Sequence, residues 1–317
     1  LGDVYKRQIQ YRYVRYEAWG TNDNYIGQEG MPMQPIDVDK TYHFFNPRAG
    51  VSYRLGERNS FFFSFAVAQK EPTRGDFTDR YMFTADYTYP SSEKLYDWEL
   101  GYTYTAPRLS LGVNLYYMKY KDQLVPTGMV NDDSNALNTN VPDSYRRGVE
   151  LSASWRATGW FTVGANATFS QNRIENYVDA LKDSPTYGKE LGDMTIAYSP
   201  DVIANAFLNF HHRGFEAVFH TQHVGKQYFT NNENDALSLD AYCVTNLNLA
   251  YTFRTRSARS VRLGLLINNL FNAEYESNGY GYSYMNTWSG PAPVRIDEAY
   301  YFPQAPLNVL ANVTVKF

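Results

Sequence analysis

Residues 307–317 alternate between apolar and polar side chains with a period of two, and Leu310 is the one apolar residue on the polar side. This period indicates a β-strand with one apolar face and one polar face. Eleven residues match the length with which a tilted strand crosses a bilayer. The aromatic ring of Phe317 fits the anchor of a membrane strand at the interface.

The same pattern recurs eleven more times along the chain. In each segment, large apolar side chains occupy one parity and small or polar side chains the other, which predicts about twelve strands. The further segments lie near 9–16, 49–55, 61–68, 98–104, 109–117, 149–155, 161–169, 202–210, 215–222, 245–253 and 261–267.

Short and long connections between these segments alternate strictly. The short ones lie near 56–59, 106–108, 156–159, 212–214 and 254–260, and the long ones near 18–41, 71–93, 122–145, 172–200, 225–241 and 273–303. Short turns on one side and long loops on the other are typical of an outer-membrane barrel. A soluble sandwich would need a second sheet to cover each apolar face. The pattern therefore predicts an all-β fold, a transmembrane antiparallel β-barrel.

Composition agrees with this fold and excludes several other classes. The chain has 317 residues with 29 Tyr, 19 Phe and 5 Trp, and aromatic side chains of this kind suit membrane interfaces. No apolar run approaches the roughly 18 residues of a transmembrane helix. The single Cys243 excludes an intrachain disulfide framework and a zinc site built on several cysteines. A net charge of −4 gives no support to nucleic-acid binding.

The first eight residues, LGDVYKRQ, are similar to adaptor-derived sequence at the edges of assembled reads. We therefore predict that residues 1–8 are a sequencing artefact and that residues 9–317 form one barrel unit. Because the chain neither begins with Met nor carries a signal peptide, we expect it to be a fragment of a longer exported protein.

Several sequence stretches resemble one known family. They are NPRAGVSYRL at 46–55, LYDWELGY at 95–102, NVPDSYRRGVEL at 140–151, NNLFNAEY at 268–275 and FPQAP at 302–306. In this order and spacing they resemble the C-terminal barrel half of a TonB-dependent outer-membrane receptor, especially of Bacteroidota-type bacteria.

The resemblance implies a 22-stranded barrel of which this chain holds the last twelve strands. In the family, an N-terminal plug fills the barrel and a TonB box contacts the energy-transducing protein. Neither occurs among these residues, so the expected partners are outer-membrane lipid, a nutrient ligand and TonB through the missing N-terminal part.

The implied activity is energy-coupled uptake of a scarce nutrient, of the ferric siderophore, cobalamin or oligosaccharide class, in the bacterial outer membrane. The alternative within membranes is a passive porin or an adhesin-like barrel. An outer-membrane hydrolase is the alternative from another class, but no spacing of Ser, His and acidic residues selects a catalytic set, and no cofactor is predicted.

Charged side chains on the inner parity, together with His220, form the first group of candidate residues. We expect all of them to line the lumen, and the arginines and glutamates to form ion pairs that face the plug in preference to the substrate. They are Arg48, Arg54, Glu99, Glu150, Glu216, His220 and Arg262.

Aromatic side chains in the long loops form the second group. They are candidates for stacking against a sugar, a catechol or a flat cofactor. The equally weighted alternative is that the strands extend above the membrane and carry an aromatic girdle. The residues are Tyr81, Tyr87, Tyr228, Tyr280, Tyr282, Tyr284 and Trp288.

Metal sites find little support. His220 and His223 are three residues apart on one strand and therefore point to opposite faces. The loop that contains Asp132 and Asp133 lacks the glycine and terminal glutamate of an EF-hand. No resident metal is predicted.

Overall fold

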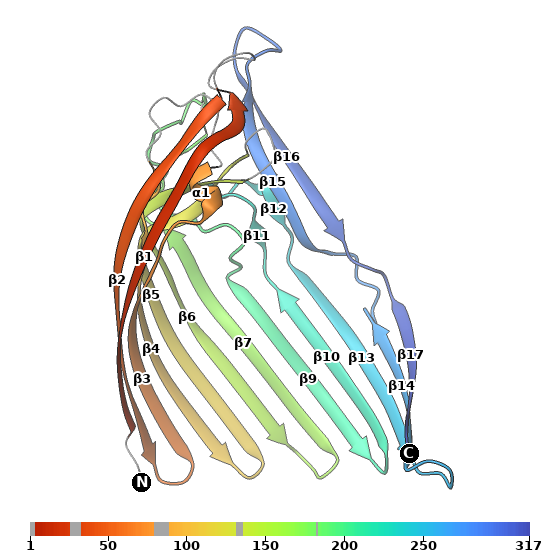
Figure 1. Cartoon of the computed structure of the whole chain (residues 1–317). Coiled ribbons are helices and arrows are strands. Elements are labelled where there is room, and N and C mark those ends of the chain that lie inside the picture. The colour runs from red at the N-terminus through yellow and green to blue at the C-terminus, as the bar shows by residue number, and fades with distance from the viewer. Residues whose placement is uncertain (1–3, 26–32, 79–88, 131–135, 182) are drawn as a thin grey trace.

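The computed structural model describes residues 4–25, 33–78, 89–130, 136–181 and 183–317. Twelve strands follow one another as antiparallel neighbours, and the short β8 (Met194–Thr195) adds to β7. Figure 1 shows them as a tilted, curved wall. In order they are β1 (Val4–Tyr25), β2 (Met33–Leu55), β3 (Asn59–Lys70), β4 (Glu93–Ala106), β5 (Leu109–Val130), β6 (Ala136–Arg156), β7 (Phe161–Ile174), β9 (Val202–His212), β10 (Phe215–Val224), β13 (Tyr242–Phe253), β14 (Ser260–Asn268) and β17 (Asn308–Lys316).

All twelve segments predicted from the sequence are confirmed, in the predicted antiparallel order. The register explains the alternation. One row of paired residues runs Val51, Phe63, Leu100, Leu115 and Val149, all apolar. The neighbouring row runs Ser52, Phe62, Gly101, Asn114 and Glu150. The first row belongs to the lipid-facing side, where Phe63, Leu100 and Leu115 are exposed.

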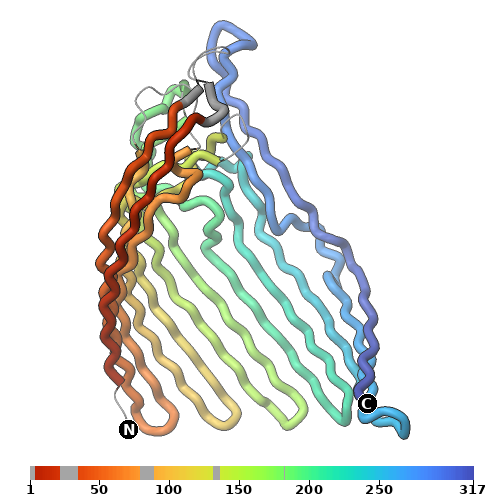
Figure 2. Tube along the Cα trace, viewed as in Figure 1, coloured from red at the N-terminus to blue at the C-terminus, as the bar shows by residue number. Residues whose placement is uncertain are grey.

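The short connections lie together at one end of the sheet and the long ones at the other (Figure 2). Residues 56–58, 107–108, 157–160, 213–214 and 254–259 join the strands at the short-turn end. No helix in the described ranges is both long and apolar enough to cross a membrane.

Four strands are much longer than predicted. β1, β2, β5 and β6 span 21–23 residues each, about twice the length that crosses a bilayer. The predicted loops 18–41 and 122–145 are therefore mostly strand. Backbone pairing continues above the membrane, although the apolar alternation that marked these strands ends there. β1 also includes residues 4–8, and the assignment of residues 1–8 as foreign stays a prediction.

The remaining long connections also carry structure. The segment 71–93 contains α1 (Arg74–Thr78), and 225–241 contains β11 (Gln227–Tyr228), the 3-10 helix η1 (Asp235–Leu237) and β12 (Ser238–Leu239). The segment 273–303 folds into a hairpin of β15 (Glu276–Asn286) and β16 (Val294–Pro303), which rises above the sheet in Figure 1.

Close packing on the inner face explains one glycine and provides a prediction. A Cβ at Gly148 would lie 2.5 Å from the carbonyl oxygen of Phe169 and 2.6 Å from the Tyr116 hydroxyl. We expect Gly148→Ala to lower the free energy of unfolding by roughly 1–3 kcal/mol, because the backbone of β7 must shift. Urea unfolding in lipid vesicles measures this loss. Gly159→Ala is the control, since a Cβ there meets no atom within 4 Å, and equal losses would contradict the packing argument.

Candidate functional site

The hairpin β15–β16 presents an aromatic face at the long-loop end. In its register Tyr280 pairs with Tyr300 and Tyr282 pairs with Glu298. Because side chains two residues apart share a face, Tyr284 and Phe302 join them. We name these six residues, Tyr280, Tyr282, Tyr284, Glu298, Tyr300 and Phe302, the tyrosine cluster.

Three hydroxyl groups of the tyrosine cluster converge on one carboxylate. Tyr282 and Tyr300 donate to Oε2 of Glu298 over 2.7 Å and 2.8 Å, and Tyr284 donates to Oε1 over 3.1 Å. These hydrogen bonds lower the pKa of Glu298 below its ordinary value, and the bond from Tyr282 has the largest effect. The same bond to Glu298 raises the pKa of Tyr282. Near neutral pH the cluster therefore presents a carboxylate held by neutral phenols.

The rings of the cluster are packed together and remain open to solvent. Tyr280 and Tyr300 stack with centroids 4.9 Å apart, and Tyr280 contacts Phe302 at 6.2 Å. Tyr280, Tyr300 and Phe302 are each 44–49% exposed. An exposed aromatic surface beside an acceptor group is suited to a ring-shaped ligand that carries hydroxyl or ammonium donors.

The opposite face of the hairpin is held by small residues. Gly279 and Gly281 lie against the ring of Phe229, and an added Cβ would approach that ring to 2.8 Å at either position. Phe229 is 2% exposed and packs with Leu237 and Leu239. The two glycines thus allow the hairpin to lie flat on the segment 225–241.

The described parts of the connections 122–145, 172–200 and 225–241 pack on one another, and we name them the loop cap. One apolar cluster joins Val125, Val141, Ile174, Tyr177 and Ile196, which come from strands and loops far apart in sequence. Burial in this cluster raises the pKa of Tyr177 to about 12.

Hydrogen bonds and an ion pair link the segment 225–241 to the rest of the loop cap. Asn231 is fully buried, donates to the carbonyl of Pro126 over 2.6 Å and accepts from the backbone N–H of Ala197 over 2.7 Å. Glu233 forms an ion pair with Arg173 and accepts from the backbone N–H of Thr195 over 3.0 Å. These bonds fix three loops relative to one another.

Glu233 makes the cap sensitive to acid. Burial alone would raise its pKa, but the hydrogen bonds from Thr195 and the charge of Arg173 outweigh this effect and lower it. A lowered carboxyl pKa stabilises the fold above the ordinary value of about 4.3, and this contribution is lost as the pH falls through the folded value.

We expect the Thr195 amide to lose hydrogen-exchange protection in that acid window, after correction for the intrinsic rate. In Glu233→Gln the protection should no longer depend on pH there. A wild-type amide that keeps full protection through the window would contradict the role of Glu233.

Several candidate residues lie outside the tyrosine cluster. Tyr81 and Tyr87 fall outside the described residues, as do Asp132 and Asp133. Tyr228 lies under the ammonium group of Lys226, 5.0 Å from the ring centroid. Trp288 follows the end of β15 and is 87% exposed.

The structure brings Tyr280, Tyr282 and Tyr284 together. Their backbone belongs to a strand that extends above the membrane, as the alternative interpretation expected. Sequence reasoning missed Glu298, Tyr300 and Phe302. Their alternation along 294–303 was the available signal.

On the inner face, Arg262 and Glu216 form an ion pair at 2.7 Å. The other two carboxylates bond to neutral neighbours: Glu150 accepts from Asn114 over 3.1 Å and Glu99 from Ser64 over 3.4 Å. Arg48, Arg54 and His220 are exposed and form no ion pair with any described carboxylate. The predicted ion-pair lining is therefore a single pair here, and contact with a plug stays a prediction. No group of three His, Cys, Asp or Glu side chains placed to hold a metal occurs in the part described.

Comparison with known proteins identifies the family. A family model described as TonB dependent receptor-like, beta-barrel, matches residues 9–270. The chain belongs to this family. Its members are receptors and transporters, and their barrels lie in the bacterial outer membrane, where this TonB-dependent receptor barrel also belongs.

Solved structures of TonB-dependent receptors share the fold. The ferric-catecholate import receptor Fiu from E. coli K12 is 18% identical with a TM-score of 0.65, over 98% of this chain and 42% of Fiu. The siderophore receptor PiuA from Acinetobacter baumannii is 14% identical with a TM-score of 0.66, over 98% and 40%. The copper transporter OprC is 16% identical with a TM-score of 0.69, over 98% and 44%. The chain thus spans about two fifths of the structures that it matches.

Proposed function

We propose that this TonB-dependent receptor barrel imports a scarce nutrient across the outer membrane by an energy-coupled route. The nutrient is of the ferric siderophore, cobalamin or oligosaccharide class. A plug segment and a segment that contacts TonB act with the barrel in this proposal. No catalytic step forms part of it.

The loop cap is the observation that favours driven import over a passive pore. A passive pore conducts through an open mouth, whereas here connections from distant strands pack on one another on the long-loop side of the sheet. Through its side chain, Asn231 links the segment 225–241 both to β5 and to the segment after β8. A cap of this kind supports capture of a specific ligand followed by a driven opening.

The tyrosine cluster is the proposed ligand contact. Its stacked rings suit the flat or ring-shaped groups common to all three nutrient classes, and Glu298 is an acceptor for hydroxyl or ammonium groups. The names of Fiu and PiuA make iron siderophores the first ligands to test.

The decisive experiment measures uptake in cells of the source bacterium. Radiolabelled ferric siderophores, cobalamin and oligosaccharides are supplied with and without a protonophore, and a strain that lacks the gene is the baseline. We expect uptake of one class to require both the gene and the proton gradient. Gene-dependent uptake that persists with the protonophore would favour a passive porin.

Two variants test the ligand contact separately from transport. We expect Tyr280→Ala to weaken binding of the transported nutrient roughly three- to tenfold, from the loss of one stacked ring. Glu298→Gln keeps the shape but removes the charge. Trp160→Ala is the control, because Trp160 is an exposed aromatic residue in the turn 157–160 at the opposite end of the sheet. Unchanged affinity in both cluster variants would remove the site from the proposal while leaving the transport assay to stand.

A further inference from the structure

The short-turn end of the sheet carries a concentration of arginine. Each of its five connections holds at least one in the turn or at the adjoining strand end, and all are exposed. The single carboxylate in these turns is Glu57. We name the arginines the basic rim: Arg58, Arg108, Arg156, Arg213, Arg254, Arg256 and Arg259.

Overall charge does not explain the basic rim, since the chain has a net charge of −4. Some cations at the long-loop end do have carboxylate partners, as in Arg173–Glu233 and Lys226–Asp235. No rim arginine forms an ion pair with a carboxylate in the described ranges. Arg254, Arg256 and Arg259 moreover lie within six residues of one another, where like charges repel. Glu57 is the one negative charge in these turns, so most of the positive charge of the rim is not balanced by carboxylates of the turns.

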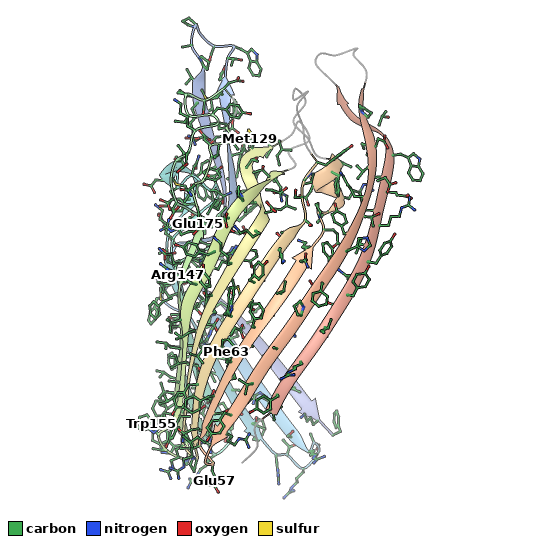
Figure 3. The ribbon with its side chains drawn as sticks, turned by 90° about the vertical axis from the view of Figure 1, so that its left-hand side faces the viewer. Glu57, Phe63, Met129, Arg147, Trp155 and Glu175 are labelled. Carbon is green, nitrogen blue, oxygen red and sulfur yellow. The ribbon has the colours of Figure 1, made fainter. Side chains whose placement is uncertain are left out.

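The rim lies where the lipid-facing surface ends. Trp155 precedes Arg156 and is 51% exposed, and Phe253 precedes Arg254 and is 36% exposed. Figure 3 shows Trp155 and Glu57 together at this lower end, away from Met129 and Glu175. Aromatic rings in such positions mark the membrane interface. The guanidinium groups beside them can thus reach the depth of lipid headgroups.

We propose that the basic rim binds anionic phospholipid headgroups of the leaflet that this end of the barrel faces. A guanidinium group binds phosphate oxygens in a bidentate manner, which a lysine ammonium cannot do. The lipid supplies the counter-charge that the turns lack, and rim and apolar band form one continuous lipid surface. This proposal is independent of the transported nutrient.

Arg108, Arg156 and Arg213 form the most tractable part of the rim. The backbone N–H of Arg156 donates to the carbonyl of Arg108 over 2.8 Å, so the two turns are adjacent. The ring of Trp160 stacks on Phe210, three residues before Arg213, at 6.1 Å. Trp155 and Trp160 are therefore local reporters of the lipids beside these arginines.

The test uses the full chain with Trp19, Trp98 and Trp288 replaced by Phe. It is reconstituted into vesicles of phosphatidylcholine containing either brominated phosphatidylglycerol or brominated phosphatidylcholine at equal mole fraction. Bromine quenches nearby tryptophan, so the ratio of quenching reports lipid preference. We expect phosphatidylglycerol to quench more strongly, and salt to reduce its advantage.

Three variants locate the preference. Arg108→Gln combined with Arg156→Gln and Arg213→Gln should lower the phosphatidylglycerol preference severalfold, since each arginine near an anionic surface contributes up to about a fivefold factor. The matching triple Arg→Lys variant keeps the three charges but not the bidentate geometry, so it should show an intermediate preference, and it shows that the barrel still folds. Arg74→Gln, Lys189→Gln and Lys226→Gln together remove three exposed charges from the opposite end and should change nothing.

Equal quenching by the two lipids in the wild type would overturn the proposal. An undiminished preference in the Gln variant would do the same, as would an equal loss in the variant of the opposite end. Co-sedimentation with peptidoglycan that depends on these arginines, without any lipid preference, would assign the rim to the cell wall instead.

Discussion

Leu249→Arg is expected to lower the free energy of unfolding by about 2–4 kcal/mol, the cost of an arginine on the lipid face near the bilayer midplane. Leu249 lies within β13, in an apolar row with Ala217, Leu265 and Ala311. The adjacent Asn248 is exposed on the other face. Asn248→Arg places the same charge in the wet interior and should cost less than about 1 kcal/mol.

Reversible urea unfolding in vesicles, followed by tryptophan fluorescence, compares the two variants. The pair is matched because the positions are adjacent on one strand and receive the same side chain. Equal losses at both positions would mean that β13 does not divide a lipid face from a lumen face, and would contradict the membrane assignment of the sheet.

The twelve sheet strands were predictable because bilayer and lumen impose opposite chemistry on alternate residues. The row Val51, Phe63 and Leu115 records that constraint directly in the sequence. Strand ends were not predictable in the same way. β5 continues to Val130 through a stretch where both faces are polar or buried by loops, so the apolar period disappears while backbone pairing continues.

The candidate site was predictable only in part. A parity argument along 279–288 selected Tyr280, Tyr282 and Tyr284, but it also selected Trp288, because sequence alone does not show that β15 ends at Asn286. Glu298 was missed because its contact with the three tyrosines depends on the pairing of β15 with β16. The loop cap was also missed, since Asn231 and Pro126 meet only through a contact 105 residues apart in sequence.

The basic rim illustrates a different limit. Each arginine is visible in the sequence, yet each is unremarkable in its own turn. They form one basic surface only because short and long connections alternate, which places all five turns at one end of the sheet, beside Trp155. The strand order of the sheet therefore brings arginines that are far apart in sequence onto one surface.

Phe229→Ala is expected to give the largest local effect, about 3–5 kcal/mol, which is typical of truncating a buried phenylalanine. The ring is 2% exposed, contacts Leu237 and Leu239, and supports Gly279 and Gly281 of the hairpin. It also meets the ring of Tyr301 at 5.8 Å. Its loss removes the surface on which β15 lies, so we expect the hairpin to detach while the membrane strands stay folded.

Hydrogen exchange separates this local opening from global unfolding. The backbone N–H groups of Phe229 and Tyr198 donate to the carbonyls of Leu237 and Tyr228, each over 2.8 Å, and report on the segment. Both should exchange at least about a hundredfold faster in Phe229→Ala, whereas amides of β4 and β5 within the sheet should not change. Trp288→Ala also removes a large aromatic ring, but one that is 87% exposed, and should leave both amides protected. If both amides also stayed protected in Phe229→Ala, the position of the tyrosine cluster would depend on the hairpin β15–β16 alone. The segment 225–241 would then have no part in shaping the site.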